Sequence, residues 1–363
     1  MGGHEANLQP GRAVSTPLPS RLLGRTGINV TTIGLGLAPL GNLYRTVSDG
    51  EARDTVDTAI EVGIRYFDTA PYYGFGLSER RAGDALRGKL EVVISTKAGR
   101  LLKPNVGADP SVERCGFISP MPFEPVYDYT HDGILRSHEQ SLQRLGLGHI
   151  DVLLIHDIGK LTHGERHRER LAELIDGGGL KALGRLREEN AVSAIGVGVN
   201  EIDICLDLMN RADLDVLLLA GRYTLLEQGA IDDLLPRCTA AEISLVIGGP
   251  FNSGILATGA TAADPPRYNY GPAPTEVRER VRRLEAVCRS HGVPLPAAAL
   301  QFPLAHPSVA AVIPGFASAD EVRTGVEHFR LPIAQSLWSD LRSENLIDPR
   351  APIPDAHLEA AAQ

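Results

Sequence analysis

Val152-Leu153-Leu154-Ile155-His156 combines the two features that decide the fold of this chain. The first four residues are apolar on both faces, as in a strand that is covered on both sides of a parallel sheet. The run then ends in an ionisable residue, which places a polar group where the strand leaves the core. Runs of this kind recur along almost the whole chain, and they indicate a parallel α/β structure.

Eight such apolar runs alternate with segments of helical period. One of these segments opens with the capping box Ser48-Asp49-Gly50-Glu51. Eight parallel strands with crossover helices predict a (β/α)8 TIM barrel, and a doubly wound open sheet is the structural alternative. The runs are Thr32–Leu37, Ile64–Phe67, Val92–Ser95, Val152–Ile155, Ser193–Val197, Val216–Leu219, Leu245–Ile247 and Ala310–Ile313.

Other segments break this rhythm. Arg21–Val30 has a hairpin pattern with glycine at the turn. Leu101–Thr130 and Pro265–Pro274 are rich in Pro and Gly and are predicted to be long loops at the carboxyl ends of the strands, the first as a flap over the substrate. Leu331–Pro354 is predicted to be a Pro-rich C-terminal arm, and it holds the only tryptophan, Trp338.

The composition bounds the class of protein. The 363 residues are 43% apolar and carry a net charge of −9 without a basic block, so we expect neither nucleic-acid nor membrane binding. We expect a flexible tail over residues 1–20 and one barrel domain over residues 21–363, as a monomer or small homo-oligomer that binds a small-molecule substrate. The first twenty residues contain no apolar stretch, so no secretory signal is expected.

The cysteines and histidines do not predict a metal site. The four cysteines are far apart, so we expect reduced thiols and a cytoplasmic location. His163 and His167 have a spacing that could hold zinc on a helix, but the surrounding sequence lacks the protease motif. A solvated polar loop is the preferred interpretation, and no metal is expected.

Three neighbouring strands end in ionisable residues, Asp68, Lys97 and His156, and Tyr73 follows in the loop after the first. Carboxyl ends of parallel barrel strands share one rim, where barrels carry their active sites. A phenol with a pKa of roughly 10 is a poor acid or base at neutral pH. We expect the Lys97 ammonium to lower the pKa of Tyr73, and Asp68 to keep Lys97 charged. A neutral His156 would orient a substrate oxygen for proton transfer.

Proton transfer alone does not reduce a carbonyl, so a hydride carrier is needed and a phosphate-binding feature is expected. Gly34-Leu35-Gly36-Leu37-Ala38-Pro39 begins like a dinucleotide fingerprint, but proline replaces its third glycine, so the pattern is weak. A better candidate is Ile313–Glu321, where the last strand leads into a helix that Ser318 could cap.

With these residues in view, the chain resembles the aldo-keto reductases from about Arg21 to Pro354. Phe67–Gly74 with Ser78-Glu79, Ser95-Thr96-Lys97 and Leu154-Ile155-His156 match the motifs that carry that family's catalytic tetrad. The resemblance implies that Tyr73 is the acid/base, that Lys97 and Asp68 tune it, and that His156 orients the substrate. The segment Gly248–Leu256 and the C-terminal arm resemble those of one branch of the family. That branch comprises L-fucose dehydrogenase, D-threo-aldose 1-dehydrogenase and pyridoxal 4-dehydrogenase.

The resemblance also implies a binding set for the cofactor and the substrate. Gly315 and Glu321 replace the lysine and arginine that hold a 2′-phosphate in NADPH-using relatives, so NAD is expected and NADP is the alternative. The implied cofactor residues are Gly36, Leu37, Asp68, Asn200, Gly249, Phe251, Ser253, Gly254, Gly315, Ser318 and Glu321. The candidate substrate residues are Tyr44, Tyr72, Tyr73, His156 and Trp338.

The expected function is NAD-dependent oxidation of an aldose at C1 to a lactone. Oxidation of pyridoxal and NADPH-dependent reduction of aldehydes or ketones are the enzymatic alternatives. A nucleotide-sensing regulatory subunit is the non-enzymatic alternative.

Overall fold

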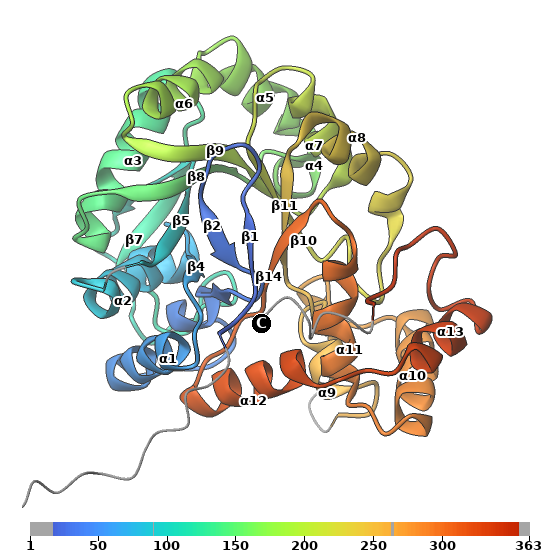
Figure 1. Ribbon diagram of the computed structural model, residues 1–363. Coiled ribbons are helices and arrows are strands. Elements are labelled where there is room, and N and C mark those ends of the chain that lie inside the picture. The colour runs from blue at the N-terminus through green and yellow to red at the C-terminus, as the bar shows by residue number, and fades with distance from the viewer. Residues whose placement is uncertain (1–16, 90, 263–264, 356–363) are drawn as a thin grey trace, which may run out of the picture.

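The barrel is closed, as Figure 1 shows for this computed structural model, which describes residues 17–89, 91–262 and 265–355. The eight parallel strands follow the order β14-β11-β10-β9-β8-β5-β4-β3, and isolated parallel bridges Ile33–Val312 and Gly36–Gly315 join the two ends. Each predicted apolar run overlaps one strand, which confirms the TIM barrel over the open sheet. The strands are β3 (Leu35–Gly36), β4 (Tyr66–Asp68), β5 (Val93–Ala98), β8 (Ile150–His156), β9 (Val192–Val199), β10 (Val216–Ala220), β11 (Ser244–Gly248) and β14 (Val309–Ile313).

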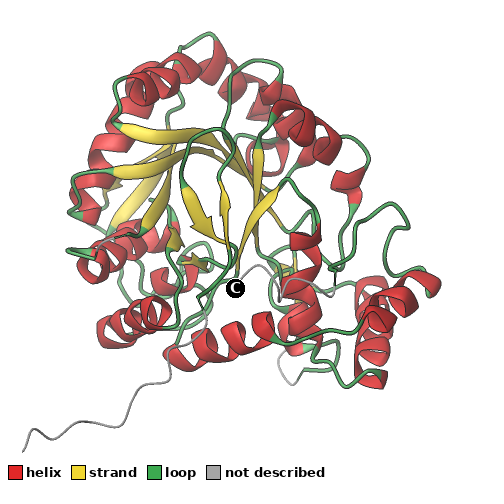
Figure 2. Ribbon diagram, in the orientation of Figure 1, coloured by secondary structure: helices red, strands yellow, loops and turns green. Residues whose placement is uncertain are grey.

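Helices surround the strands on the outside (Figure 2). The predicted capping box is present at Ser48 and Glu51, and the Ser48 side chain accepts from the Glu51 N–H. The crossover helices are α1 (Asp49–Glu61), α2 (Leu77–Leu86), α3 (His131–Leu145), α6 (Gly179–Glu188), α7 (Ile202–Met209), α8 (Leu234–Ala241), α11 (Leu295–Gln301) and α12 (Ala319–Arg330). The inserted or appended helices are α4 (Lys160–His163), α5 (His167–Ile175), α9 (Ile255–Thr258), α10 (Thr275–Ser290) and α13 (Gln335–Ser343). The 3-10 turns are η1 (Ala38–Gly41), η2 (Tyr73–Gly76), η3 (Gly164–Arg166), η4 (Gly229–Ile231) and η5 (Phe302–Ala305).

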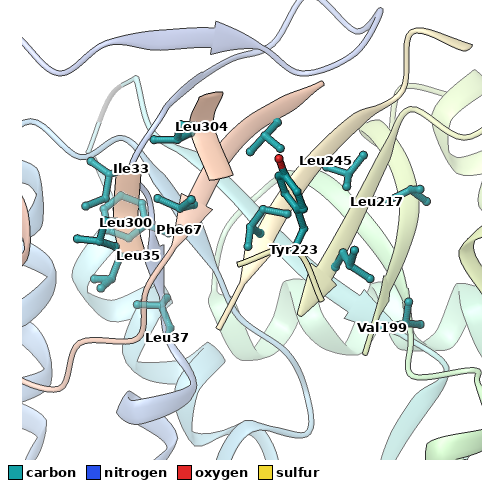
Figure 3. Close-up of a cluster of buried hydrophobic side chains, with 14 of the residues drawn as sticks. Ile33, Leu35, Leu37, Phe67, Val199, Leu217, Tyr223, Leu245, Leu300 and Leu304 are labelled. Atoms are coloured by element: carbon teal, nitrogen blue, oxygen red, sulfur yellow. The ribbon is translucent and has the colours of Figure 1, made fainter. Parts of the chain in front are cut away.

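The core has an outer and an inner part. The outer part lies between the strands and the helices, and Figure 3 shows Phe67, Leu245 and Leu300 within it. The inner part fills the barrel, where Leu23 and Val30 pack with strand residues. These two residues come from the predicted hairpin, which contains β1 (Ser20–Leu22) and β2 (Asn29–Thr31). The hairpin closes the amino end of the barrel, which leaves the carboxyl rim for chemistry.

The two long segments predicted as loops contain regular structure. Residues 101–130 include most of an antiparallel pair, β6 (Arg100–Pro104) with β7 (Phe123–Tyr127), and residues 265–274 include β12 (Arg267–Tyr268) with β13 (Gly271–Pro272). Each predicted loop therefore carries a short antiparallel strand pair that its Pro- and Gly-rich composition does not predict, and the role of residues 101–130 as a substrate flap stays a prediction.

The ends of the chain also differ from the expectation. Leu18 is buried and the Pro19 carbonyl accepts from the Thr32 N–H, so the packed chain begins before residue 21. Residues 1–16 of the predicted tail lie outside the described residues. Across the described part of the chain, no helix has the length and apolar character to cross a bilayer.

Candidate active site

Asp68 and Lys97 meet at the carboxyl ends of β4 and β5 as a buried ion pair. The Lys97 Nζ lies 2.7 Å from Asp68 Oδ2, and it also donates to the Thr69 carbonyl at 2.8 Å. The Ser95 hydroxyl donates to Asp68 Oδ1 at 2.7 Å. Asp68 is therefore fixed on both oxygens and holds Lys97 in place, in the arrangement that the sequence predicts.

Tyr73 begins η2, the short turn that follows β4, and its ring lies above this ion pair. The Lys97 Nζ is 4.8 Å from the centroid of the Tyr73 ring, and the His156 ring stands edge-on at 6.0 Å between centroids. A Cβ on Gly41 would lie 2.6 Å from the Tyr73 carbonyl carbon, so only glycine allows η1 to pack this closely. That close contact sets the backbone position of Tyr73.

The pKa of Tyr73 lies well above its ordinary value, which corrects our expectation that Lys97 lowers it. Burial is the main cause, the carboxylates of Asp68 and Asp157 add to it, and Arg100 opposes it. The charge of Lys97 is already paired with Asp68, so little of it is left to stabilise a phenolate. Tyr73 therefore holds its proton at neutral pH.

His156 ends β8 and stays neutral. Burial holds its pKa well below the ordinary value, and the positive charges of Arg100 and Lys97 lower it further. A neutral imidazole at this point can donate a hydrogen bond to a substrate oxygen or accept one from it. His156 is thus neutral, as the sequence leads us to expect, and its role toward a substrate stays a prediction.

Two charged residues that sequence reasoning missed also lie here. Arg100 follows β5 by one glycine, and Asp157 follows His156 directly. The Arg100 Nη2 donates to Asp157 Oδ2 at 2.5 Å, and that oxygen is 3.4 Å from the His156 Nε2. Asp157 has a φ of 44°, a left-handed conformation that is uncommon outside glycine. Asp157 could have been predicted from the sequence, because it lies just past the end of a predicted strand.

The proposed cofactor residues lie on several neighbouring strand ends around the rim. The Gly36 N–H donates to the Pro314 carbonyl, which brings Gly36 beside Gly315. Asn200 follows β9, and its Nδ2 lies 3.5 Å from Asp157 Oδ1. Leu37 is fully buried, its N–H donates to the Asp68 carbonyl and its own carbonyl accepts from Ser78, so it has little left to offer a ligand.

The loop after β11 carries Gly249, Phe251, Ser253 and Gly254. Three of these, Gly249, Ser253 and Gly254, have positive φ, and a Cβ on Gly254 would meet nothing within 4 Å. The buried Asn252 amide anchors the loop to the carbonyl of Gly221. The loop is thus a firmly held stretch of open backbone, as close approach of a dinucleotide requires.

The start of α12 carries Ser318 and Glu321 next to the end of β14. The Ser318 hydroxyl accepts from the Glu321 N–H, which confirms the predicted cap. The Glu321 carboxylate accepts from the Ala317 N–H at 2.8 Å and pairs with Arg45 at 2.9 Å. An acidic helix start of this kind can accept from ribose hydroxyls, so together with the loop after β11 the residues present fit a nicotinamide dinucleotide.

The candidate substrate residues do not all converge. Tyr72 is partly exposed, and its ring lies 6.2 Å from that of His156. The Tyr44 ring stacks on the Arg267 guanidinium at 4.4 Å. Trp338 is fully buried in α13, which packs on α10 outside the barrel (Figure 1), so its ring offers no surface to a substrate.

The two histidines considered for zinc lie at short helices rather than in the predicted polar loop. His163 ends α4 and its Nε2 pairs with the Tyr129 hydroxyl at 3.0 Å, whereas the His167 Nδ1 pairs with the Ile158 carbonyl. Within the described ranges, no group of three potential metal ligands is found.

The comparisons with known proteins agree with this geometry. The aldo/keto reductase family model matches residues 32–345. Pyridoxal 4-dehydrogenase of Microbacterium luteolum is 44% identical over 90% of this chain and 97% of its own length. D-threo-aldose 1-dehydrogenase of a Pseudomonas species is 42% identical over 88% of this chain and 96% of its own length.

The fold matches as well. The holo form of an aldo-keto reductase from Bacillus halodurans superposes with a TM-score of 0.70 at 23% identity, covering 94% of this chain and 99% of that one. The chain therefore belongs to the aldo/keto reductase family of oxidoreductases, which use nicotinamide dinucleotides as cofactors.

Proposed function

We propose that this enzyme oxidises a cyclic hemiacetal, an aldose at C1, to the lactone with NAD. The observation that carries the proposal is the convergence of the Tyr73 ring and the His156 ring above the buried Lys97–Asp68 pair. The two relatives that are more than 40% identical are named for dehydrogenation of an aldose and of pyridoxal, which supports oxidation over reduction.

The roles of the four residues follow from their positions. A bound nicotinamide would supply the acceptor for the hydride that leaves the carbon bearing the reacting hydroxyl. The ionised form of Tyr73, a minor species at neutral pH, takes the proton of that hydroxyl, so the carbon–oxygen double bond forms as both hydrogens depart. His156 holds the oxygen in line, and Lys97 with Asp68 keeps the Tyr73 ring supported from below. Asn200, the loop 249–254 and the start of α12 are the proposed dinucleotide contacts.

The choice of NAD over NADP rests on Glu321. Its carboxylate lies at the start of α12, where it would repel a 2′-phosphate and could accept from ribose hydroxyls. Arg45 pairs with it and reduces the repulsion, so we expect a preference for NAD rather than exclusion of NADP.

Glu321→Arg tests this assignment. The variant should raise the ratio of NADP to NAD efficiency by about ten- to a hundredfold, the size of a charged hydrogen bond. Glu327→Arg makes the same charge change on an exposed site of the same helix and is the control. Equal shifts in both variants would contradict the placement of the 2′-position beside Glu321.

The alternatives differ in substrate, direction or class. Pyridoxal is itself a cyclic hemiacetal in solution, so the same residues would serve its oxidation to a lactone. Reduction of aldehydes with NADPH would use the protonated Tyr73 as the acid. A regulatory subunit would bind the dinucleotide without turnover. We propose a cytoplasmic enzyme that acts as a monomer or small homo-oligomer.

A panel of substrates separates these alternatives. We expect NADH formation from NAD with at least one of L-fucose, D-arabinose, L-galactose or pyridoxal, followed by absorbance, and slower turnover with NADP. Lactone should accumulate in equal amount to NADH. NADPH consumption with simple aldehydes, together with no oxidation of the panel, would refute the proposal.

A further inference from the structure

Arg100 is a buried guanidinium with unused donors beside the candidate active site. It is 3% exposed, and its Cζ lies 4.0 Å from the centroid of the Tyr72 ring and 5.4 Å from that of Tyr127. Nη2 donates to Asp157. Nε and Nη1 are buried and have no hydrogen-bond partner among the residues that the structure describes. The group is thus held between two rings with one edge unsatisfied.

Another largely buried arginine shows what a purely structural role looks like in this fold. Arg81 is 11% exposed, and its three nitrogens donate to Asp49, to the carbonyls of Leu40 and Val47, and to the Asn42 amide oxygen. Buried donors are nearly always paired, because leaving them unpaired costs free energy. Other arginines among the described residues leave one buried Nε unpaired, whereas Arg100 leaves both Nε and Nη1 unpaired, and it lies beside the candidate active site.

The Asp157 carboxylate, which accepts from Arg100, also lies beside the His156 imidazole. Asp157 Oδ2 lies 3.4 Å from the His156 Nε2, and the Tyr72 ring that carries the Arg100 guanidinium lies 6.2 Å from the His156 ring. Asp157 therefore lies beside the imidazole that would hold the reacting oxygen, and Arg100 is hydrogen-bonded to the same carboxylate oxygen.

We propose that Arg100 and Asp157 form a subsite for the hydroxyl on the carbon next to the reacting carbon, which makes the enzyme selective for 2-hydroxylated cyclic hemiacetals. A hydroxyl matches the pair because its oxygen accepts from Arg100 while its hydrogen is donated to Asp157. The guanidinium is held in place by the rings, so little rotamer entropy is lost on binding. This inference rests on the proposed function for its choice of substrate.

The test compares D-arabinose with 2-deoxy-D-ribose, which is the same sugar without its 2-hydroxyl. The unmodified enzyme should oxidise D-arabinose about ten- to a hundredfold more efficiently, the discrimination expected of a charged hydrogen bond. In Arg100→Gln this preference should fall to within about threefold, through loss of efficiency on D-arabinose alone. Arg170→Gln is the control, because Arg170 also lies near the Tyr127 ring but pairs with Glu173.

A binding measurement tests the subsite separately from the proposed oxidation. Calorimetry of each sugar with the NADH-loaded enzyme should show tighter binding of D-arabinose, and this difference should vanish in Arg100→Gln. Such binding without any turnover would refute the proposed oxidation and leave the subsite standing. Binding of neither sugar, or the same preference in Arg100→Gln, would overturn the subsite.

A second variant shows whether the effect of Arg100→Gln comes from loss of the fold rather than from loss of the subsite. Arg100→Gln leaves the Asp157 carboxylate buried without its partner, so the double variant Arg100→Gln/Asp157→Asn removes both charges together. The melting temperature of the double variant should stay near that of the unmodified enzyme. If the double variant retains the preference for D-arabinose, the proposal is wrong.

Discussion

At the residue scale, the stability of the fold depends on the buried ion pair of Lys97 and Asp68. Their side chains are 2% and 3% exposed, so removing one leaves an unpaired buried charge. Lys97→Met should lower the free energy of unfolding by about 3–5 kcal/mol, and the double variant Lys97→Met/Asp68→Asn should recover most of it. Urea denaturation measures both. Arg25→Gln breaks an exposed pair with Asp213 and should cost less than about 1 kcal/mol.

The pKa of Tyr73 predicts how the reaction depends on pH. Because that pKa is raised above the ordinary value, mainly by burial, the phenolate that accepts a proton is scarce at pH 7. The efficiency of oxidation should therefore increase between about pH 7 and 9.5, approaching tenfold per pH unit. The lowered pKa of His156 adds no titration in this range. A flat profile, with chemistry shown to be rate-limiting, would contradict this view of Tyr73.

The positions of the residues at strand ends were predictable from the sequence, whereas side-chain contacts between distant loops were not. Asp68, Lys97 and His156 could be placed together because parallel strands share a rim. The pairing of Arg100 with Asp157 joins residues 57 positions apart, and their position in the sequence alone gives no sign of it. Trp338 stood out as the only tryptophan, but a large aromatic ring packs in a core at least as readily as against a ligand.

At the scale of elements, one glycine sets how closely α2 packs on α3. A Cβ on Gly83 would lie 1.7 Å from the Leu145 carbonyl oxygen, so the two helices would have to separate. Gly83→Ala should destabilise the protein by about 1–3 kcal/mol or more. Gly184, in α6, has nothing within 4 Å of its Cβ position, so Gly184→Ala should stabilise by roughly 0.5–1 kcal/mol. Thermal unfolding of both variants checks the opposite signs.

Elements with strong periodicity were predicted well. The eight apolar runs and the caps at Ser48 and Ser318 follow from local chemistry, and all are present. The β6–β7 pair escaped prediction because its strands flank a Pro- and Gly-rich stretch of 18 residues, from 105 to 122, and only the tertiary structure brings them together.

At the scale of the whole molecule, buried histidines make the fold sensitive to acid. Burial lowers the pKa of His138 and His156, and burial with nearby arginines lowers that of His163 to about 4. The unfolded chain takes up protons at these residues below about pH 6.5, whereas the folded chain does not, so stability falls as the pH falls. His138 and His156 each contribute up to about 1.4 kcal/mol per pH unit. The partly exposed His163 contributes less, because solvent screens its charge.

Urea midpoints between pH 7 and pH 5 measure this dependence. His138→Gln removes one of the three groups and should make the decrease shallower. If the midpoints stay constant from pH 7 to pH 5, these histidines are protonated in the folded protein, contrary to the burial described above.

The account depends most on proton transfer by Tyr73 in a hydride-transfer enzyme. The direct measurement is NADH formation from NAD and the best sugar of the panel, with Tyr73→Phe beside Tyr223→Phe, whose hydroxyl is buried in the core without a hydrogen-bond partner among the described residues. Tyr73→Phe should keep its melting temperature and NAD affinity while kcat falls at least about a hundredfold, and Tyr223→Phe should behave as the unmodified enzyme. Undiminished kcat in Tyr73→Phe would contradict the account.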